Sequence, residues 1–184
     1  GFTSQIASVC QTNQEEYSWK YSDFVPPPVD NLLAYELLIR DFMAVHTFSG
    51  LIDTLDYLEN LGINVIELMP VNEFEGNDSW GYNPSFWYNQ QSPNPVYSWG
   101  YDFNHESEYT QTFVDSVNNF WLTEYQLDGF RFDFTKGFTN TPGDGSAYDA
   151  DRIAILKRMA DEIWAVNPDA YVILEHFGTT RENV

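Results

Sequence analysis

The sequence predicts an α/β fold with a parallel sheet, because short apolar runs alternate with segments of helical periodicity. Four apolar runs have the length of buried strands and span residues 32–39, 63–69, 127–134 and 170–174. Three segments place their apolar residues on one helical face and span residues 51–61, 109–125 and 149–166. Strands joined by helices in this order form βαβ units, whose strands are parallel and whose crossovers are right-handed.

The first βαβ unit is predicted around the helix at residues 51–61. Ser49 is the expected N-cap, and Gly62 is the expected residue just after the helix, where glycine is favoured. The second strand ends at Pro70. Residues 70–107 then read as a long loop rich in polar and aromatic residues, and a loop of that length is usually functional or disordered. The aromatic residues favour a functional loop.

Two longer helices follow, and the 3.6-residue period predicts which face of each is buried. In the segment 109–125 the expected buried face consists of Phe113, Val117, Phe120, Trp121 and Tyr125. In the segment 149–166 it consists of Ile153, Leu156, Met159, Ala160 and Ile163.

The N-terminal residues 1–31 are predicted to be a separate segment of one or two strands followed by a stiff proline-rich linker, Pro26-Pro27-Pro28. The main domain is then expected at residues 32–184. Cys10 is the only cysteine, which excludes an internal disulfide and a thiolate metal cluster.

The charge of the chain restricts its partners. The net charge is −20, from 28 acidic and 8 basic residues. Nucleic acids and anionic membrane surfaces bind basic surfaces, so neither is an expected partner. No apolar run is long enough to span a bilayer. Aromatic residues make up 17% of the chain, and their rings stack on sugars as well as filling cores.

Charged residues occur on the strand predicted at residues 127–134. Because side chains alternate between the faces of a strand, Phe130, Phe132 and Phe134 should point to one side and Arg131 and Asp133 to the other. A neighbouring guanidinium favours the ionised carboxylate. An ionised carboxylate at the end of a strand is what a covalent glycosyl mechanism requires. A purely structural ion pair is an equally weighted alternative.

Glu175 follows the next predicted strand, 170–174, after four apolar residues. If the two strands are neighbours, about 4.8 Å apart, the carboxylates of Asp133 and Glu175 are roughly 5 Å apart, the separation of a retaining glycosidase pair. Partial burial is predicted to raise the pKa of Glu175, which suits a general acid. Considered alone, Glu175 is better explained as an exposed residue at a strand exit.

Five stretches, read in this order along the chain, resemble motifs of the α-amylase family of glycoside hydrolases. Residues 35–42 and 61–71 resemble the family's first and second barrel strands, and residues 80–84 resemble the loop that follows. Gly129–Lys136 resembles the strand-four motif G-F-R-x-D-x-x-K, and Val172–Glu175 resembles the end of strand five. The resemblance runs from about residue 32 to residue 177.

The resemblance implies a role for each matching residue. Asp133 matches the family's nucleophile and Glu175 its acid/base, while Arg131 matches the arginine that supports the nucleophile. Tyr82 matches the tyrosine that stacks on the sugar at the cleavage site. The predicted substrate-binding residues are therefore Arg131, Tyr82, Lys136, Trp80 and, as a weaker candidate, His105, and no metal ligand is assigned.

The resemblance also implies a (β/α)₈ barrel of the TIM type, which takes about 250 residues. This chain is shorter, so the expected barrel is incomplete, with about four to five strands. Asp102–His105 has the letters but not the spacing of the family's Asp-x-x-x-Asn-His motif on strand three, and no helix and strand fit between Tyr88 and Trp99. The family's second Asp and strands six to eight are not seen, and Gly137 replaces a histidine of many relatives.

The predicted activity is that of a retaining glycoside hydrolase of the α-amylase type, which cleaves α-1,4-glucosidic bonds in starch-like glucans. Hydrolysis and glycosyl transfer use the same two carboxylates, so both stay open. No cofactor is required, although the family often binds structural calcium. Exposed sheet edges predict a homo-oligomer. The expected location is extracellular or periplasmic.

Two other functions compete with hydrolysis. A catalytically impaired glucan-binding remnant, or a fragment of a longer amylase, would keep the aromatic residues Trp80, Tyr82, Trp87 and Trp99 but lack the third carboxylate. Starch binding that survives Asp133→Asn, without turnover by the parent protein, would favour it. An acidic calcium-binding or interaction protein would show calcium-dependent stability and no affinity for sugar. It ranks last, because the sequence has no Asp-x-Asp-x-Asp-Gly loop.

Overall fold

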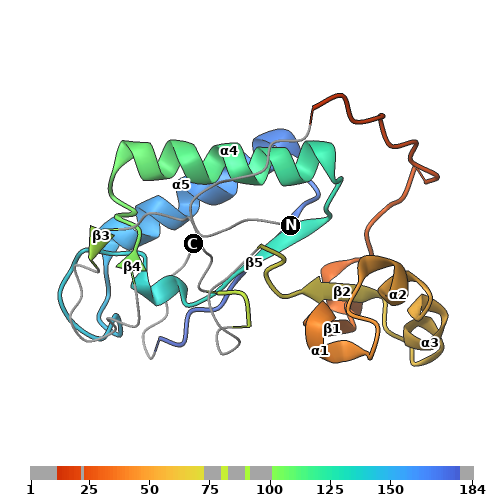
Figure 1. Ribbon diagram of the computed structural model, residues 1–184. Coiled ribbons are helices and arrows are strands. Elements are labelled where there is room, and N and C mark those ends of the chain that lie inside the picture. Colours follow the sequence, from red (N-terminus) through yellow and green to blue (C-terminus); the bar gives the residue numbers. More distant parts are fainter. Residues whose placement is uncertain (1–11, 22, 73–79, 83–89, 92–100, 179–184) are drawn as a thin grey trace. The chain divides into compact units, whose positions relative to one another are not determined.

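The computed structural model describes residues 12–21, 23–72, 80–82, 90–91 and 101–178 (Figure 1). The chain divides into two compact units, residues 1–87 and residues 88–184. Each unit is described by itself. The predicted boundary between an N-terminal segment and a main domain at residue 31 stays a prediction.

The first unit contains a parallel βαβ arrangement. Strand β1 (Ala34–Leu37) follows the short 3-10 helix η1 (Val29–Asn31) and pairs in parallel with β2 (Val65–Leu68), with Leu37 opposite Leu68. Three short helices connect the strands, α1 (Ile39–Phe42), α2 (Phe48–Ile52) and α3 (Leu55–Asn60). Leu37, Leu51 and Leu58 form a small buried core between strand and helices. The parallel pair predicted from the sequence is confirmed.

The helix predicted at residues 51–61 is divided into α2 and α3 in the structure. Thr54 lies at the break, and its hydroxyl donates to the carbonyl of Leu51 at 2.7 Å, a local bond that competes with helix continuation. The predicted N-cap at Ser49 is wrong, because the Thr47 hydroxyl accepts the N–H of Gly50 at 3.1 Å and the helix begins at Phe48.

Gly62 ends α3 as predicted. Its φ is +86°, and the N–H groups of Gly62 and Ile63 donate to the carbonyls of Glu59 and Leu58 at 2.8 and 3.1 Å. These two bonds form a Schellman motif, which satisfies the last carbonyls of the helix.

The strands predicted within residues 1–24 are not found in the described residues 12–21 and 23–24, which lie outside helices and strands and are exposed. An extended segment becomes a strand only when a neighbour satisfies its backbone N–H and C=O groups. Residues 1–11 lie outside the described part.

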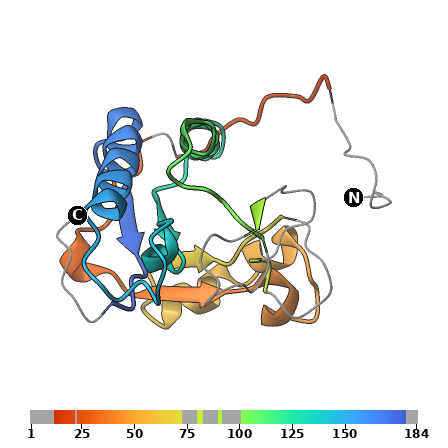
Figure 2. The same ribbon diagram turned by 90° about the vertical axis from the view of Figure 1, so that its left-hand side faces the viewer.

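The second unit begins with an antiparallel pair that the sequence did not indicate, β3 (Gln90–Gln91) with β4 (Tyr101–Asp102). Helix α4 (Glu108–Glu124), strand β5 (Gly129–Phe132), the 3-10 helix η3 (Thr135–Gly137), helix α5 (Ala150–Val166) and strand β6 (Tyr171–Leu174) follow. Strands β5 and β6 pair in parallel, with Phe132 opposite Leu174, and they lie side by side in Figure 2. Both long helices lie within one residue of their predicted bounds.

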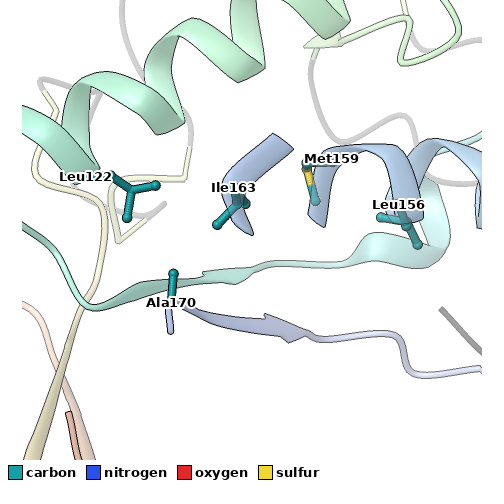
Figure 3. Packing of buried hydrophobic residues seen from close by; sticks show 5 residues of the cluster. All are labelled: Leu122, Leu156, Met159, Ile163 and Ala170. Carbon is teal, nitrogen blue, oxygen red and sulfur yellow. The ribbon is translucent and has the colours of Figure 1, made fainter. Parts of the chain in front are cut away.

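The core of the second unit lies between its two long helices and the β5–β6 pair. Figure 3 shows Leu122 on α4 and three residues of α5, Leu156, Met159 and Ile163, above the strands, with Ala170 directed toward them from below. Side chains of both strands complete the cluster, namely Phe130, Phe132, Val172 and Leu174. The buried stripe predicted for α5 is confirmed at these positions, with Ile153 partly exposed.

The buried face predicted for α4 is wrong. Phe113 and Phe120 are exposed, and the helix contacts the core through Val114 and Leu122. Phe120 instead packs with Trp121 and Tyr125, at ring-centroid distances of 6.0 and 5.6 Å. The helix carries more apolar residues than one face can bury, so periodicity alone did not select the face that contacts α5 and the sheet.

Gly129 allows β5 to lie close to β6. A Cβ at this position would collide with the backbone of Tyr171, which faces Gly129 across the pair. Glycine in a strand often marks such a close backbone approach. The residue therefore helps to set the distance between the two strands.

The fold class is thus confirmed as α/β with parallel strand pairs. Among the described residues the parallel strands form two separate pairs, and a closed barrel is not shown. None of the described helices combines the length and the apolar character that crossing a membrane requires.

Candidate active site

The two candidate catalytic carboxylates lie at adjacent strand ends. Asp133 directly follows β5 and Glu175 directly follows β6, and the last paired residues of these strands, Phe132 and Leu174, are opposite each other. The ladder continues one step further, because the N–H of Glu175 donates to the carbonyl of Phe132 at 2.9 Å. The parallel pairing therefore brings together two carboxylates that are far apart in the sequence.

Arg131 connects the two carboxylates. Its Nη1 lies 2.7 Å from Oδ1 of Asp133, and its Nη2 forms an ion pair with Oε1 of Glu175. The side chains of Arg131 and Glu175 are about one fifth exposed, at 18% and 22%, whereas that of Asp133 is 41% exposed. One guanidinium therefore forms ion pairs with both carboxylates at the ends of the two strands. Asp133 is the more accessible of the two to a molecule from solvent.

The pKa of Glu175 is raised above its ordinary value. Burial is the main cause, and the neighbouring Asp133 carboxyl adds to it, while the Phe134 N–H and Arg131 oppose it. Two carboxyls this close resist simultaneous ionisation. A carboxyl with a raised pKa beside an accessible carboxylate has the properties expected of a general acid next to a nucleophile.

The chain leaves the strand conformation at Phe134, so the predicted alternation of side chains ends at Phe132. Phe134 has a left-handed backbone, with φ 49° and ψ 44°, and it precedes η3. The prediction that Phe134 shares a face with Phe130 and Phe132 is therefore wrong. A turn at this point, and not a continued strand, follows Asp133.

Two backbone donors of this turn contact Glu175. The N–H of Phe134 donates to Oε2 of Glu175 at 3.2 Å, and the N–H of Thr135 donates to the Glu175 carbonyl at 2.8 Å. The Thr135 hydroxyl lies 3.2 Å from the same carbonyl and 3.3 Å from Nδ1 of His176. Thr135 is completely buried. The sequence patterns did not single out Thr135. The available signal was a polar side chain two positions after Asp133, at the exit of a predicted strand.

Lys136 lies within η3 and is buried, at 8% exposed. Its Nζ is 5.2 Å from the ring centroid of Phe134, a distance typical of a cation–π contact. Lys136 is thus close to the turn that follows Asp133, on the same element as Thr135. Its predicted role in substrate binding stays a prediction.

His105 lies in the loop before α4, as predicted, whereas Asp102 of the same predicted loop belongs to strand β4. Its ring stacks on Phe138 with centroids 3.8 Å apart and an interplanar angle of 10°. Burial lowers the pKa of His105 to about 4. The side chain is therefore packed against the loop after η3 and is not simply solvated, as loop histidines often are.

Arg152 is a second buried polar residue that the sequence patterns did not single out. It is 1% exposed and donates to the carbonyls of Lys136, Gly145 and Ala147 at 2.8, 3.0 and 2.9 Å. The loop between η3 and α5 is therefore held from inside. Its helical spacing could have indicated burial, because Arg152 falls on the same stripe of α5 as Leu156.

The predicted sugar-stacking residues belong to the first unit, whereas both carboxylates belong to the second. Trp80 and Tyr82 are 56% and 39% exposed. Gly81 between them has a φ of +96°, and a Cβ there would contact the Pro70 backbone. Trp87 and Trp99, which the glucan-binding hypothesis also uses, lie outside the described residues.

A metal site does not emerge from the part of the chain that the structure describes, where no three His, Cys, Asp or Glu side chains cluster suitably. The expectation that no cofactor is required, with structural calcium left open, stays a prediction.

The chain is similar in sequence to several known proteins. No family model matches the sequence. A malto-oligosyltrehalose trehalohydrolase of Saccharolobus solfataricus is 28% identical over 167 residues, which cover 64% of this chain and 30% of that protein. A malto-oligosyltrehalose trehalohydrolase of Mycobacterium tuberculosis is 46% identical over 65 residues, covering 35% of this chain and 11% of the relative. The chloroplastic isoamylase 1 of Arabidopsis thaliana is 34% identical over 87 residues, covering 43% and 11%.

These matches are partial on both sides, and the chain spans less than a third of the length of each of these relatives. The Saccharolobus alignment is longer than the part of this chain that it covers, so the relative has residues there that this chain lacks. These relatives are glycoside hydrolases of the α-amylase family, and the chain is similar to them over part of its length, in agreement with the resemblance of its motifs.

Proposed function

We propose that the chain belongs to a retaining glycoside hydrolase that cleaves α-1,4-glucosidic bonds in starch-like glucans. The observation that supports this most directly is the pairing of β5 with β6, which puts Asp133 and Glu175 at adjacent strand ends around Arg131. In a retaining mechanism one carboxylate attacks the anomeric carbon while a neighbouring acid protonates the leaving oxygen. Asp133 is the nucleophile in this proposal, and Glu175 is the acid and then the base.

The accessibility and protonation of the two groups support these roles. Asp133 is the more exposed carboxyl, so it can approach a bound sugar, and Arg131 is within 2.7 Å to balance its charge. Glu175 is less exposed, and its raised pKa favours the protonated form that the first step needs. In the second unit, Lys136 on η3 and His105 in the loop before α4 are the proposed substrate-binding residues. In the first unit, Tyr82 and Trp80 are the residues proposed to stack on sugar rings.

The finer architecture is part of the same proposal. The two parallel pairs, β1–β2 and β5–β6, would be strands of a TIM-type barrel, in which catalytic residues lie at the carboxyl ends of strands. Asp133 and Glu175 both occupy such positions.

Further strands would come from additional chain or from a second copy. Sedimentation of the purified protein would separate a monomer from an oligomer.

The substrates to test follow from the names of the relatives and from the motifs. Soluble starch and a malto-oligosyltrehalose should each be incubated with the protein, and new reducing ends or free trehalose measured. Asp133→Asn should reduce turnover by at least about 10⁴-fold, because it removes the group that forms the covalent intermediate. Asp161→Asn, an exposed carboxylate on α5, is the matched control and should leave turnover unchanged.

A substrate with a good leaving group separates the two proposed roles. Fluoride leaves without protonation, so Glu175→Gln should retain much of its first-step rate on α-maltosyl fluoride while losing about 10² to 10⁴-fold on starch. Asp133→Asn should lose the activity on both substrates. Equal losses of Glu175→Gln on fluoride and starch would contradict the acid role, and a folded but inactive parent protein would favour the impaired glucan-binding alternative.

A further inference from the structure

The turn formed by Phe134 and Thr135 has an unusual backbone for its sequence. Phe134 has positive φ, at 49°, in a region that residues other than glycine, asparagine and aspartate rarely adopt. Such conformations persist only where the surrounding structure enforces them, and they concentrate at functional sites. The position of this one is informative, because Phe134 directly follows the candidate nucleophile Asp133.

The left-handed residue changes the direction of two consecutive N–H groups. In a strand, successive backbone groups point to opposite sides, so two adjacent N–H groups cannot both reach one neighbour. A left-handed residue followed by a helical one turns successive N–H groups toward the same point, which is a concave site for an anion. Here both N–H groups reach Glu175, one at Oε2 at 3.2 Å and the other at its carbonyl at 2.8 Å.

Neighbouring groups hold the turn in place. The N–H of Gly137 donates to the Phe134 carbonyl at 2.9 Å, and that of Phe138 donates to the Thr135 carbonyl at 3.1 Å. A Cβ on Gly137 would come within 3.1 Å of the Phe134 ring. The Lys136 ammonium lies over the same ring. The ring and the hydrogen bonds together stabilise a backbone conformation that the sequence does not favour by itself.

We propose that Phe134 is a positioning residue, whose left-handed backbone directs its N–H at Oε2 and thereby fixes the orientation and protonation of Glu175. The inference rests on the proposed acid/base function of Glu175. Among the described residues, Asp133, Arg131, which binds the opposite oxygen Oε1, and His176, which contacts the Thr135 hydroxyl, face the same site. The Lys136 ammonium lies over the Phe134 ring of the turn. A hydrogen bond to the ionised carboxylate favours ionisation, so the turn opposes the effect of burial and of Asp133.

Two substitutions of nearly equal size isolate the backbone from the ring. Phe134→Asn and Phe134→Leu both remove the aromatic side chain, but asparagine tolerates the left-handed region and leucine does not. The Leu variant should show a kcat/KM on starch about 10- to 100-fold below that of the Asn variant. Its loss on α-maltosyl fluoride should be smaller, and its pH profile should shift to higher pH, because Glu175 loses a donor to its ionised form.

A titration that needs no activity is the deciding measurement. Carboxyl carbons of glutamate are observed by NMR in the parent and in both variants, with the Glu175 signal assigned through Glu175→Gln. The apparent pKa of Glu175 should be higher in Phe134→Leu than in Phe134→Asn. Gln126→Leu is the matched control, since Gln126 is also left-handed, at φ 49°, and precedes the opposite end of β5. It should lower stability without changing the titration.

Each outcome has a distinct meaning. Identical Glu175 titrations in the folded Asn and Leu variants would overturn the inference, whether or not the protein is active. A parent protein without activity but with the expected difference in titration would overturn the proposed function and keep the positioning device. If Phe134→Leu does not fold, Phe134→Gly against Phe134→Ala makes the same comparison, because glycine adopts positive φ at little cost and alanine does not.

Discussion

The two units of the chain contain the same local topology with different consequences. The β1–β2 pair of the first unit and the β5–β6 pair of the second are both parallel, both have a register of four residue pairs, and both are connected through helices. In the first unit the connection consists of three helices of four to six residues, whereas in the second it includes one of 17 residues. The longer helix takes part in a larger core, which lies between the helices and the strands of its unit.

The two strand pairs differ most in the residues at the carboxyl ends of their strands. Each unit has an Arg–Asp ion pair with a nitrogen–oxygen distance of 2.7 Å. In the first unit both residues follow β1, whereas in the second Arg131 lies within β5 and Asp133 follows it. Arg40 and Asp41 are neighbours in sequence, at 31% and 56% exposed, and belong to the small helix α1. Arg131 is less exposed and joins Asp133 to a second carboxylate from another strand. Parallel pairing supplies proximity, and the residues at the strand ends decide whether proximity yields a chemical site.

The largest expected effect tests this difference between the two arginines. Arg131→Met should reduce kcat/KM on starch by about 100-fold or more, because it removes the cation that balances charge at the proposed catalytic pair. Arg40→Met removes an exposed cation, whose ion pair contributes little. Its activity should stay within about twofold of the parent. Steady-state kinetics of both purified variants gives the two values of kcat/KM. Similar losses in the two variants would mean that Arg131 supports the fold and not the chemistry.

Arg131→Met should also change the dependence of stability on pH. The pKa of Glu175 is raised in the folded protein, mainly by burial, and removal of the guanidinium should raise it further. A carboxyl with a raised folded pKa stabilises the fold below its unfolded pKa and loses that contribution as pH rises through the folded pKa. Urea unfolding at about pH 4 and about pH 7 should therefore show a larger deficit of the variant at the higher pH. A constant deficit would contradict the coupling of Arg131 to Glu175.

The first residue pair of each sheet provides the next largest contrast. Gly129 faces Tyr171 in the second unit, and Ala34 faces Val65 in the first. Gly129→Ala should cost about 3 kcal/mol of unfolding free energy, because the new Cβ would force the strands apart. Ala34→Gly removes a Cβ and should cost only about 0.5–1 kcal/mol. Similar losses in urea unfolding would show that the second unit relaxes around the added methyl group.

The N-caps of the two units give a smaller contrast. Asp149 caps α5 by accepting the N–H groups of Asp151 and Arg152 at 3.0 and 3.1 Å, and it also accepts the Thr139 hydroxyl. Thr47 caps α2 through one bond of 3.1 Å. Asp149→Ala should cost about 2 kcal/mol and Thr47→Ala about 0.5–1 kcal/mol. Amide hydrogen exchange in each helix measures the two losses of stability separately. A larger loss for Thr47→Ala than for Asp149→Ala would contradict the expectation from the number of capping hydrogen bonds.

The last contrast concerns the two described histidines that precede a helix, His105 in the second unit and His46 in the first. Burial lowers the pKa of His105 to about 4, so the folded protein resists its protonation while the unfolded chain binds a proton near the ordinary value of 6.5. Stability should therefore fall as pH decreases from 6.5 to 4, by about 2–3 kcal/mol from this group. His105→Phe should keep the stack on Phe138 and flatten this slope.

The matched control is His46→Asn, because His46 is exposed. This substitution should leave the slope of stability against pH unchanged. A His105→Phe variant with the same slope as the parent would show that other groups cause the acid sensitivity.

Local patterns predicted much of the fold and half of the site's geometry. The positions of α4, α5, β5 and β6 follow from periodicity, and the parallel pairing of β5 with β6 follows from the βαβ order. The conformation of Phe134 could not be predicted, because phenylalanine has no preference for the left-handed region. The break at Thr54 was missed for a related reason, since a single hydroxyl bond to Leu51 outweighed a continuous apolar pattern.

The sequence by itself determined the order of strands and helices, the acidic character of the chain, and the identity of Asp133, Arg131 and Glu175 as candidate residues. The order of elements and the charge depend on side-chain chemistry and on periods within a few residues, whereas the three candidate residues were singled out by their match to the motifs that the chain resembles. Only the tertiary structure decided which face of α4 is buried, that one guanidinium contacts both carboxylates, and that a turn donates to Glu175. Each of these depends on atoms from segments distant in sequence, whose distances and angles are set by packing.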